Sequence, residues 1–339
     1  MNGGVVVRML VAAVMALAAC APVHAATPPA QPFRIVTADG TELTRRIAAD
    51  LHKRLLLAFA DAPSDPRHAR RQLVVAIGPL ALRDLLARPC DCVLVAAYTS
   101  SQVWHALTAA VPLPRQLGMT AIFAEPAPAD QLKLIDLLFK RPVRVAAILS
   151  ADTLFLKPVL DAAVNVEYFG AREDINRGLN RISQARVLLA VPDRRIYNAD
   201  NIRNILLSTY RHNQAVIGFS ADMVKAGALA STYSDLEHIN AQVADVSADF
   251  LRTGALAPPQ FPRYFSTIVN EGVARSLEVP VDTAAREFSH HPATARDFPP
   301  HPAAADDVSV APAGPRELLF PPFEAREPSR PGPWREVAP

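Results

Sequence analysis

The chain has 339 residues, of which 50% are hydrophobic, and a formal net charge of +2. This length exceeds that of a single typical domain, so we expect two lobes, each with enough apolar residues for a core. Acidic and basic residues are mixed along the chain, which argues against the concentrated basic face of a nucleic-acid-binding protein.

The N-terminal residues 1–26 have the pattern of an export signal. The apolar run Met9–Ala19 follows a short segment containing Arg8 and is too short to span a bilayer as a stable helix. It leads into Cys20 through Leu-Ala-Ala, which resembles the lipobox of bacterial lipoproteins, whose cysteine is lipidated. Cleavage after Ala25, at a small-residue site, is the alternative. Lipidation of Cys20 is favoured, and both alternatives place the protein in the periplasm or cell envelope.

Strands and helices alternate through the first part of the chain, as in an α/β sheet. We expect a helix that Thr41 or Thr44 opens and that ends near residue 60, and a polar connection over 61–71. The other expected elements are strands over 33–37, 73–77, 92–97 and 119–124, and helices over 80–87 and from 102 to 107. We assign residues 32–128 to the first lobe.

The cysteines left after the signal are Cys90 and Cys92, separated by one residue. Such a pair is half of a tetrahedral metal site, and no further cysteine or nearby histidine completes it, so no metal is expected. A disulfide across a single residue would be strained. We therefore expect two thiols, buried or half-buried at the start of a strand, with a disulfide as the less favoured alternative.

The same alternation continues over residues 129–283, which we assign to a second lobe with a return strand to the first. The segment 186–229 reads as strand, loop and helix twice in succession, with Asn198 or Asp200 capping the first helix and Ser220 or Asp222 the second. The other expected elements are helices over 130–140, 159–163, 175–182 and 235–252, the last closed by Gly254, strands over 144–149, 164–169 and 265–269, and a short helix capped by Asn270.

The composition changes from about residue 284 onward. Prolines, alanines and charged residues dominate there, and branched apolar residues are few. Such a segment cannot bury enough apolar surface to fold, so we expect a disordered tail over 284–339. Leu318-Leu319-Phe320 and Trp334 are either partner contacts or, as the favoured interpretation, incidental.

Motifs of catalysis and cofactor binding are missing from the sequence. There is no phosphate-binding loop, no dinucleotide-binding glycine pattern and no metalloprotease motif, and the segment 218–222 lacks the final glycine of a nucleophile elbow. We therefore expect neither an enzyme nor a bound cofactor.

Four segments resemble the substrate-binding proteins of ABC transporters, in particular the family with tryptophan- and tyrosine-binding members. These are Val191-Pro192-Asp193, Ala215–Ser220, Val224–Leu229 and Asn270–Ala274 with the Leu277 and Pro280 that follow. The resemblance implies a type 1 periplasmic-binding fold, with two Rossmann-like lobes of parallel sheet that close on a small molecule by a hinge. It also implies a small-molecule ligand, possibly amino-acid-like, and a membrane permease as partner.

Two positions depart from the family pattern. The family carries a proline-glycine-glycine-asparagine segment between the first lobe and the crossing helix, where this chain has Glu125-Pro126-Ala127-Pro128-Ala129. A glycine is expected midway along the last long helix, and this chain has Ile239-Asn240 there.

Ligands of open parallel sheets sit beyond the carboxyl ends of the strands. In the second lobe this rule selects Asp193 together with Phe219 and Ser220, and the resemblance implies that Asp193 faces a ligand amino group. In the first lobe it selects the loops that contain Thr37, Gly78, Tyr98, Thr99 and Ser100. The alternative for Asp193 is that it only shapes its turn.

The sequence thus predicts an exported, lipid-anchored solute-binding protein of the ABC-transporter type, without catalysis. The alternative is a binding-protein-like module that has lost its ligand and serves as a structural adaptor in the cell envelope. It differs from the first interpretation in having no ligand between the lobes.

We predict that Cys20→Ser will release the protein from the membrane or leave it unprocessed, because the acyl chains supply the anchoring energy. Fractionation of cells and N-terminal analysis of the product measure this. Wild-type protein found wholly in the soluble fraction, with Ala26 as its first residue, would contradict lipidation.

Overall fold

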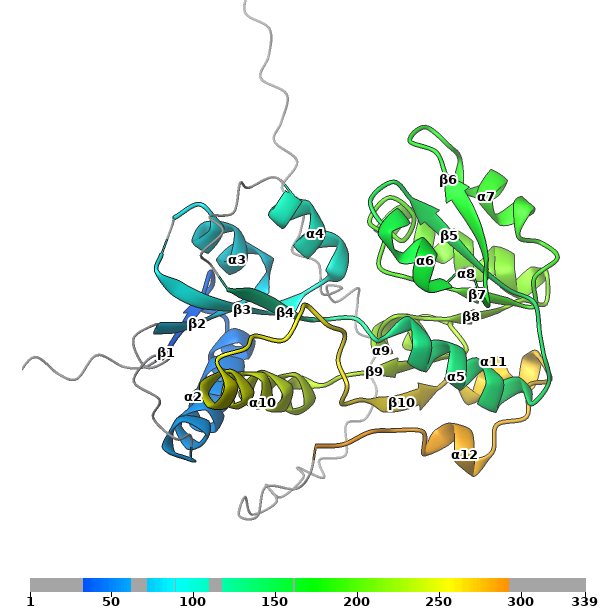
Figure 1. The fold of residues 1–339 in the computed structure, drawn as a ribbon. Coiled ribbons are helices and arrows are strands. Elements are labelled where there is room, and N and C mark those ends of the chain that lie inside the picture. The colour runs from blue at the N-terminus through cyan, green and yellow to red at the C-terminus, as the bar shows by residue number, and fades with distance from the viewer. Residues whose placement is uncertain (1–32, 62–71, 89, 110–117, 161, 293–339) are drawn as a thin grey trace, which may run out of the picture.

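The computed structural model describes residues 33–61, 72–88, 90–109, 118–160 and 162–292. They form two lobes, each a sheet of mainly parallel strands with helices on both faces (Figure 1). The expected fold class, two Rossmann-like lobes, is confirmed. The predicted signal with Cys20, the 62–71 part of the polar connection and the tail beyond Pro292 lie outside the described residues.

The first lobe is built on a parallel sheet with the strand order β1-β2-β3-β4. Its strands are β1 (Phe33–Thr37), β2 (Gln72–Ile77), β3 (Cys92–Thr99) and β4 (Met119–Phe123). The helices between them are α2 (Glu42–Asp61), α3 (Gly78–Leu86) and α4 (Ser101–Ala109). Apolar runs such as Leu73–Ile77 are buried because helices cover both faces of the sheet. The strand after Cys92 runs two residues further than expected, through Tyr98 and Thr99.

The helices of this lobe reveal an unusual connection. Each strand steps one place in the same direction across the sheet, yet α2 packs on one face and α3 and α4 pack on the other. The described part of the connection from β1 to β2 therefore runs over the face opposite to the one used by the two connections that follow.

The second lobe has the strand order β10-β9-β8-β7-β5-β6, with only β10 antiparallel to its neighbour. Its strands are β5 (Val145–Ser150), β6 (Asn165–Phe169), β7 (Val187–Leu189), β8 (Ala215–Ile217), β9 (Ala230–Tyr233) and β10 (Ser266–Val269). Its helices are α5 (Pro128–Phe139), the 3-10 turn η1 (Leu154–Leu156), α6 (Lys157–Leu160), α7 (Ile175–Arg181), α8 (Ala199–Arg211), α9 (Ala221–Lys225), α11 (Glu271–Ser276) and α12 (Thr283–Arg286).

The caps of the second lobe follow the sequence. The side chains of Asn198, Ser220 and Asn270 each accept a hydrogen bond from a backbone N–H in the first turn of the helix that follows. Gly254 ends α10 (Leu236–Thr253) at a φ of +72°, in the left-handed region where glycine is favoured.

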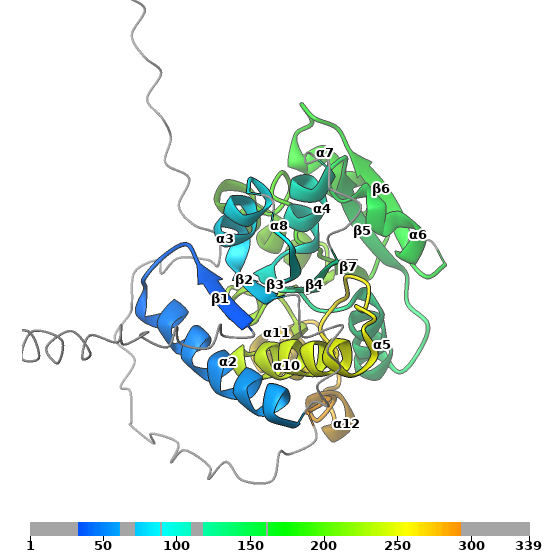
Figure 2. The same ribbon diagram turned by 60° about the vertical axis from the view of Figure 1, so that its left-hand side comes forward.

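The chain crosses between the lobes three times: from β4 to α5, from β9 to α10, and from α10 back to β10. The return element differs from the expectation. α10, rather than the late strand, packs against α2 on the first lobe, and β10 joins the second sheet (Figures 1 and 2). Gln260 also returns to the first lobe, where it forms a bridge with Ile122 of β4.

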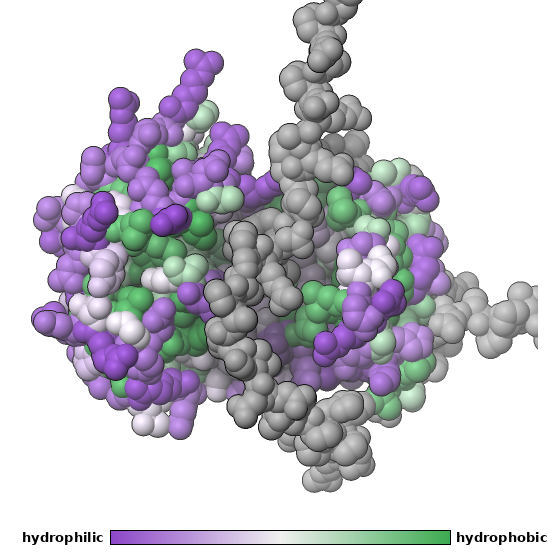
Figure 3. Space-filling model, turned by 180° about the vertical axis from the view of Figure 1, so that it is seen from behind, coloured by the Kyte–Doolittle hydropathy of each residue, from purple (hydrophilic) through white to green (hydrophobic). Residues whose placement is uncertain are grey.

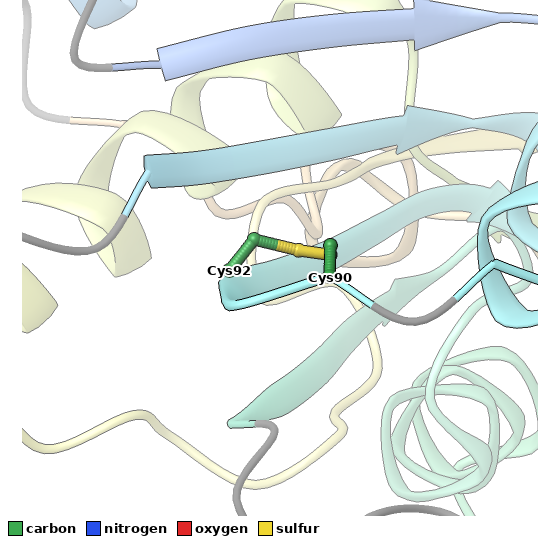
Figure 4. The surroundings of a disulfide bond; sticks show 2 residues. All are labelled: Cys90 and Cys92. Carbon is green, nitrogen blue, oxygen red and sulfur yellow. A yellow bond between two sulfur atoms is a disulfide. The ribbon is translucent and has the colours of Figure 1, made fainter.

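Cys90 and Cys92 form a disulfide at the start of β3 (Figure 4). The expectation of two thiols was wrong, and the less favoured alternative is the one observed. The Cα atoms are 5.3 Å apart, within the usual range for a disulfide, so the backbone before the strand accommodates the pair. Such a bond agrees with a compartment outside the reducing cytosol.

Packing extends further along the C-terminal segment than the expected boundary at residue 284. Ala285 is fully buried, and the ring of Phe288 packs 5.1 Å from that of Phe265. The backbones of Phe265 and His290 exchange two hydrogen bonds, of 2.8 and 2.9 Å. The second lobe therefore includes residues up to Pro292, because Phe288 supplies the apolar contact that composition alone did not reveal.

We predict that truncation after Arg286 will lower the melting temperature by roughly 4–8 °C relative to truncation after Pro292. The shorter protein loses the Phe288 contact, worth about 2 kcal/mol, and the backbone pairing of His290. Differential scanning calorimetry of the two truncated proteins measures the difference. Equal melting temperatures would show that residues 287–292 contribute nothing to stability.

Candidate functional site

The facing carboxyl ends of the two sheets enclose a small cavity. Its walls come from the crossing after β4, from η1, and from the segments that follow β7 and β8. The lining includes Glu125, Pro126, Leu156, Val191, Pro192 and Phe219. The cavity volume is about 10 Å³, which is room for about one water molecule.

Glu125 supplies the charge of this cavity. The residue is 5% exposed, and Oε1 of its carboxylate accepts a hydrogen bond from the backbone N–H of Ser101 at 2.8 Å. Its other oxygen, Oε2, is buried and has no hydrogen-bond partner among the described residues. Burial raises the pKa of Glu125, because water is withdrawn from the ionised form. The side chain therefore presents an acceptor that no group within the described ranges satisfies.

Two contacts hold the lobes together beside the cavity. The backbone N–H of Arg194 donates to Oε1 of Gln102 at 3.4 Å. The rings of His105 and Phe155 lie with their centroids 4.0 Å apart, tilted by 43°. Burial lowers the pKa of His105, so this contact favours the neutral imidazole.

Asp193 lies in the turn after β7, as expected, but its carboxylate is engaged within its own lobe. It is 1% exposed and accepts hydrogen bonds from the backbone N–H groups of Ser150, at 2.9 Å, and Arg195, at 3.0 Å. The hydroxyl of Thr153 donates to it as well. These contacts match the alternative interpretation, in which Asp193 shapes its turn.

Phe219 and Ser220 follow β8 and play different parts. Phe219 lines the cavity, and its ring packs edge-on against that of Tyr197 with centroids 5.5 Å apart. The Ser220 hydroxyl accepts from the backbone N–H of Met223 at 3.2 Å and so caps α9. Ser220 thereby fixes the start of the helix that follows Phe219.

The predicted residues of the first lobe lie outside the cavity lining. Tyr98 turns away toward α10, where its hydroxyl donates to Oδ1 of Asn240 at 2.8 Å. Thr99 is buried, and Ser100 accepts from a backbone N–H at the start of α4. Thr37 is exposed at the end of β1, and Gly78 begins α3 at a φ of +84°. Of the eight predicted ligand-binding residues, Phe219 lines this cavity.

Glu125 was missed as a site residue. The sequence shows it only as a departure from the family segment after the first lobe. The signal that identifies it is the one applied to Asp193, since Glu125 also follows the last apolar residues of a strand, β4. Hydrogen-bond donors from segments distant in sequence decide which of the two carboxylates, that of Asp193 or that of Glu125, faces the gap between the lobes.

No three His, Cys, Asp or Glu side chains in the described ranges gather as metal ligands would. Within those same ranges, no helix combines the length and hydrophobicity needed to cross a membrane. Seen from behind, hydrophilic side chains predominate along the outer rims of both lobes, and apolar side chains gather on the face of each lobe (Figure 3).

Comparison with known proteins identifies the architecture. A substrate-binding protein with adhesive properties from Clostridium difficile, in its ligand-free, open form, superposes with a TM-score of 0.54. The match is 13% identical and covers 75% of this chain and 97% of that one. This chain has the type 1 periplasmic-binding fold.

Two further solved structures match over similar lengths. A conserved domain protein from Vibrio cholerae gives a TM-score of 0.48 at 16% identity, covering 76% of this chain and 98% of that one. An ABC domain from Streptococcus pneumonia in complex with L-Trp gives 0.46 at 14% identity, with the same coverage. The sequence matches no family model and no curated protein.

We predict that Asp193→Ala will lower the free energy of unfolding by about 2–4 kcal/mol, because three donors lose a buried acceptor. Urea denaturation followed by circular dichroism measures the loss. The matched control is Asp249→Ala on the exposed side of α10, whose ion pair with Arg252 is a surface contact and whose loss should cost less than about 1 kcal/mol. Equal stability of the two variants would contradict the turn-shaping role of Asp193.

Proposed function

We propose that this chain is an exported solute-binding protein that captures a small molecule between its two lobes and delivers it to an ABC permease. The support is its type 1 periplasmic-binding fold, together with the acceptor that Glu125 presents between the lobes. The proposal places the protein in the periplasm or cell envelope, anchored to the membrane through Cys20, and includes no catalytic step.

The observation that carries the proposal is that Oε2 of Glu125 has no hydrogen-bond partner in the described part of the chain. A buried acceptor without a donor costs about 1–3 kcal/mol, so a ligand that supplies the donor recovers this free energy. An ammonium group suits the position best, because it also compensates the carboxylate charge. The apolar neighbours Leu156, Pro192 and Phe219 suit an apolar part of the same ligand. An amino-acid-like cation or amine combines the two properties.

Ligand entry requires the lobes to separate. Small-molecule sites have volumes of about 300–1,000 Å³, far more than the present cavity. Opening at the three crossings would break the contacts between Gln102 and Arg194 and between His105 and Phe155. Hinge closure of two lobes on a ligand is an established way of building such a site.

Asp193 and Ser220 act indirectly in this proposal. Asp193 fixes the turn that presents Pro192, and Ser220 fixes the helix start beside Phe219. Both therefore position the apolar wall of the second lobe opposite Glu125.

We predict that a screen of amino acids and small amines will find one that raises the melting temperature of the wild type. At a ligand concentration of a hundred times Kd, the stabilisation is about 2.7 kcal/mol, or roughly 5–10 °C. Glu125→Gln should abolish this shift, because it keeps the shape of the side chain and removes its charge. Asp249→Asn, an exposed acid distant from the cavity, is the control and should keep the full shift.

The unliganded Gln variant should remain folded. The folded-state pKa of Glu125 is raised, so this carboxyl contributes stability that is present below its ordinary pKa of 4.5 and lost as the pH rises through the raised value. The substitution therefore removes no favourable charge from the unliganded protein. If millimolar concentrations of the screened compounds leave the wild type unshifted, the transport proposal fails and the adaptor alternative takes its place.

A further inference from the structure

The segment 287–292 follows α12 and runs beneath β10 toward α10, where the chain crosses between the lobes (orange in Figure 1). The backbones of Phe265 and His290 pair just before β10, at the crossing back from α10. The next residue, His291, contacts His238 at the start of α10, with its Nδ1 3.0 Å from Nε2 of His238. This segment, which we call the strap, therefore joins two of the three crossings.

The hydrogen bonds of His238 assign the protons of this histidine pair. Nδ1 of His238 accepts from the backbone N–H of Asp235 at 3.4 Å, as part of the capping box of α10. Nε2 therefore carries the proton of the neutral ring and donates it to Nδ1 of His291. A buried imidazole thus holds an exposed one at the end of the strap.

The contact tolerates one added proton but not two. If Nδ1 of His238 takes the first proton, this nitrogen lies 3.3 Å from Oδ1 of Asp235, which serves as its ion-pair partner, and Nε2 still donates to His291. With a second proton on His291, both facing nitrogens carry a hydrogen and neither can accept. Two positive charges then meet across the same short distance, so the doubly protonated pair must separate.

The surroundings of the pair also oppose its protonation. Burial is the largest influence on His238 and lowers its pKa below the ordinary value of 6.5. Asp235 and Glu237 of α10 act in the opposite direction, and His291 adds to the lowering. His238 therefore contributes stability that is present above pH 6.5 and lost as the pH falls through the lowered value. Titratable groups on the neighbouring elements are Asp130 and Lys133 of α5, Asp245, Arg263, Tyr264 and His290 beside the strap, and Asp50 and Tyr98 of the first lobe.

We propose that the strap is a pH-sensitive restraint on the hinge between the lobes, fastened at neutral pH by the contact of His291 with His238 and released in acid by the second proton. One end of the strap belongs to the second lobe, where α12 and Phe288 pack on the core. Its other end is fastened to α10, which packs in the core of the first lobe. A segment fixed to both lobes limits their relative motion, and its release frees the hinge.

A captured solute then escapes more readily in acid. This consequence rests on the function proposed above, whereas the release of the strap does not, and it is measured without any ligand.

The variant His291→Gln separates protonation from the contact. The amide oxygen of glutamine accepts from Nε2 of His238, as Nδ1 of His291 does, and glutamine does not titrate. The variant should therefore keep the strap fastened in acid. The matched control is His290→Gln, which replaces the adjacent histidine of the strap. The His290 ring packs against Tyr264 rather than His238, so this control should keep the acid response.

Hydrogen–deuterium exchange of the full-length, ligand-free protein tests the proposal. Exchange of residues 287–292 reports whether the strap is fastened, and the amide of Arg194, which donates to Gln102 across the lobes, reports whether they separate. At about pH 5 we expect both to exchange at least about fivefold faster in the wild type than in His291→Gln, and equally fast at about pH 7.5. Comparison at one pH cancels the intrinsic exchange rate and the protonation of Glu125 and His105, which both proteins share.

Three outcomes would overturn the proposal. Equal exchange of the strap in the wild type and His291→Gln in acid would show that the pair does not fasten it. Loss of the acid response in His290→Gln would assign the titration to the other histidine. Fast exchange of the strap with an unchanged Arg194 amide would show that the strap does not restrain the lobes.

A second measurement covers the case in which glutamine fails to hold the strap even at neutral pH. Histidine ring NMR of the wild type follows the two protonation steps of the pair directly. Exchange of the strap should rise with the second step, and a rise that accompanies the first step, or neither, would contradict the proposal.

Discussion

The fold depends on the buried side chain of Asn240, which holds α10 against the first lobe. Its amide nitrogen donates to the backbone oxygen of Ile47 at 3.1 Å and to the carboxylate of Asp50 at 2.8 Å, and its oxygen accepts from the hydroxyl of Tyr98. Tyr98 and Asn240 are 142 residues apart in the sequence. A buried amide with every partner present stabilises one arrangement, since any other arrangement leaves polar groups unsatisfied. The sequence position at which the family resemblance predicts glycine thus carries a contact that glycine cannot make.

This contact makes the first lobe incomplete without the second half of the chain. Ile239, Val243, Val246 and Phe250 of α10 pack into the same core as β2 and β3, next to the buried stripe of α2. Without α10 that core would be open to water on one side. The two lobes are therefore separate in space, but the first lobe needs α10 to complete its core. The crossings on either side of α10 are held in place by that core as well as by the covalent chain.

Local patterns predicted most of the elements, and long-range contacts account for what they missed. The caps at Asn198, Ser220 and Asn270 depend on residues three positions away, so the sequence shows them directly. The strand β9 reads Ala-Ser-Thr-Tyr and has no apolar periodicity. Its place comes from Gln131, a buried residue of α5 whose amide oxygen accepts from the backbone N–H of Thr232 at 3.1 Å. No pattern within β9 reveals that partner, which lies 101 residues earlier.

In the candidate site, too, the local pattern predicts the position of a residue in the chain, and long-range contacts decide where its side chain points. The rule that ligands lie beyond strand ends selects both Asp193 and Glu125, because each follows a strand. Three donors hold the carboxylate of Asp193, whereas Oε2 of Glu125 has no partner among the described residues, and these contacts form only in the folded chain. Tyr98 was expected in the cleft for a related reason, since its loop is at the correct edge of the sheet. Its positive φ of 59° and its bond to Asn240 turn the ring to the opposite side.

The state of Glu125 links closure of the lobes to the proposed ligand. Burial raises the pKa of Glu125, because a carboxylate withdrawn from water without a counter-charge is disfavoured. In the proposed complex, a cationic ligand would supply the opposite charge within the cavity and so favour the ionised form. Binding of the proposed ligand would then be coupled to the protonation of Glu125, and closure on the ligand and closure on the empty cleft would respond differently to pH.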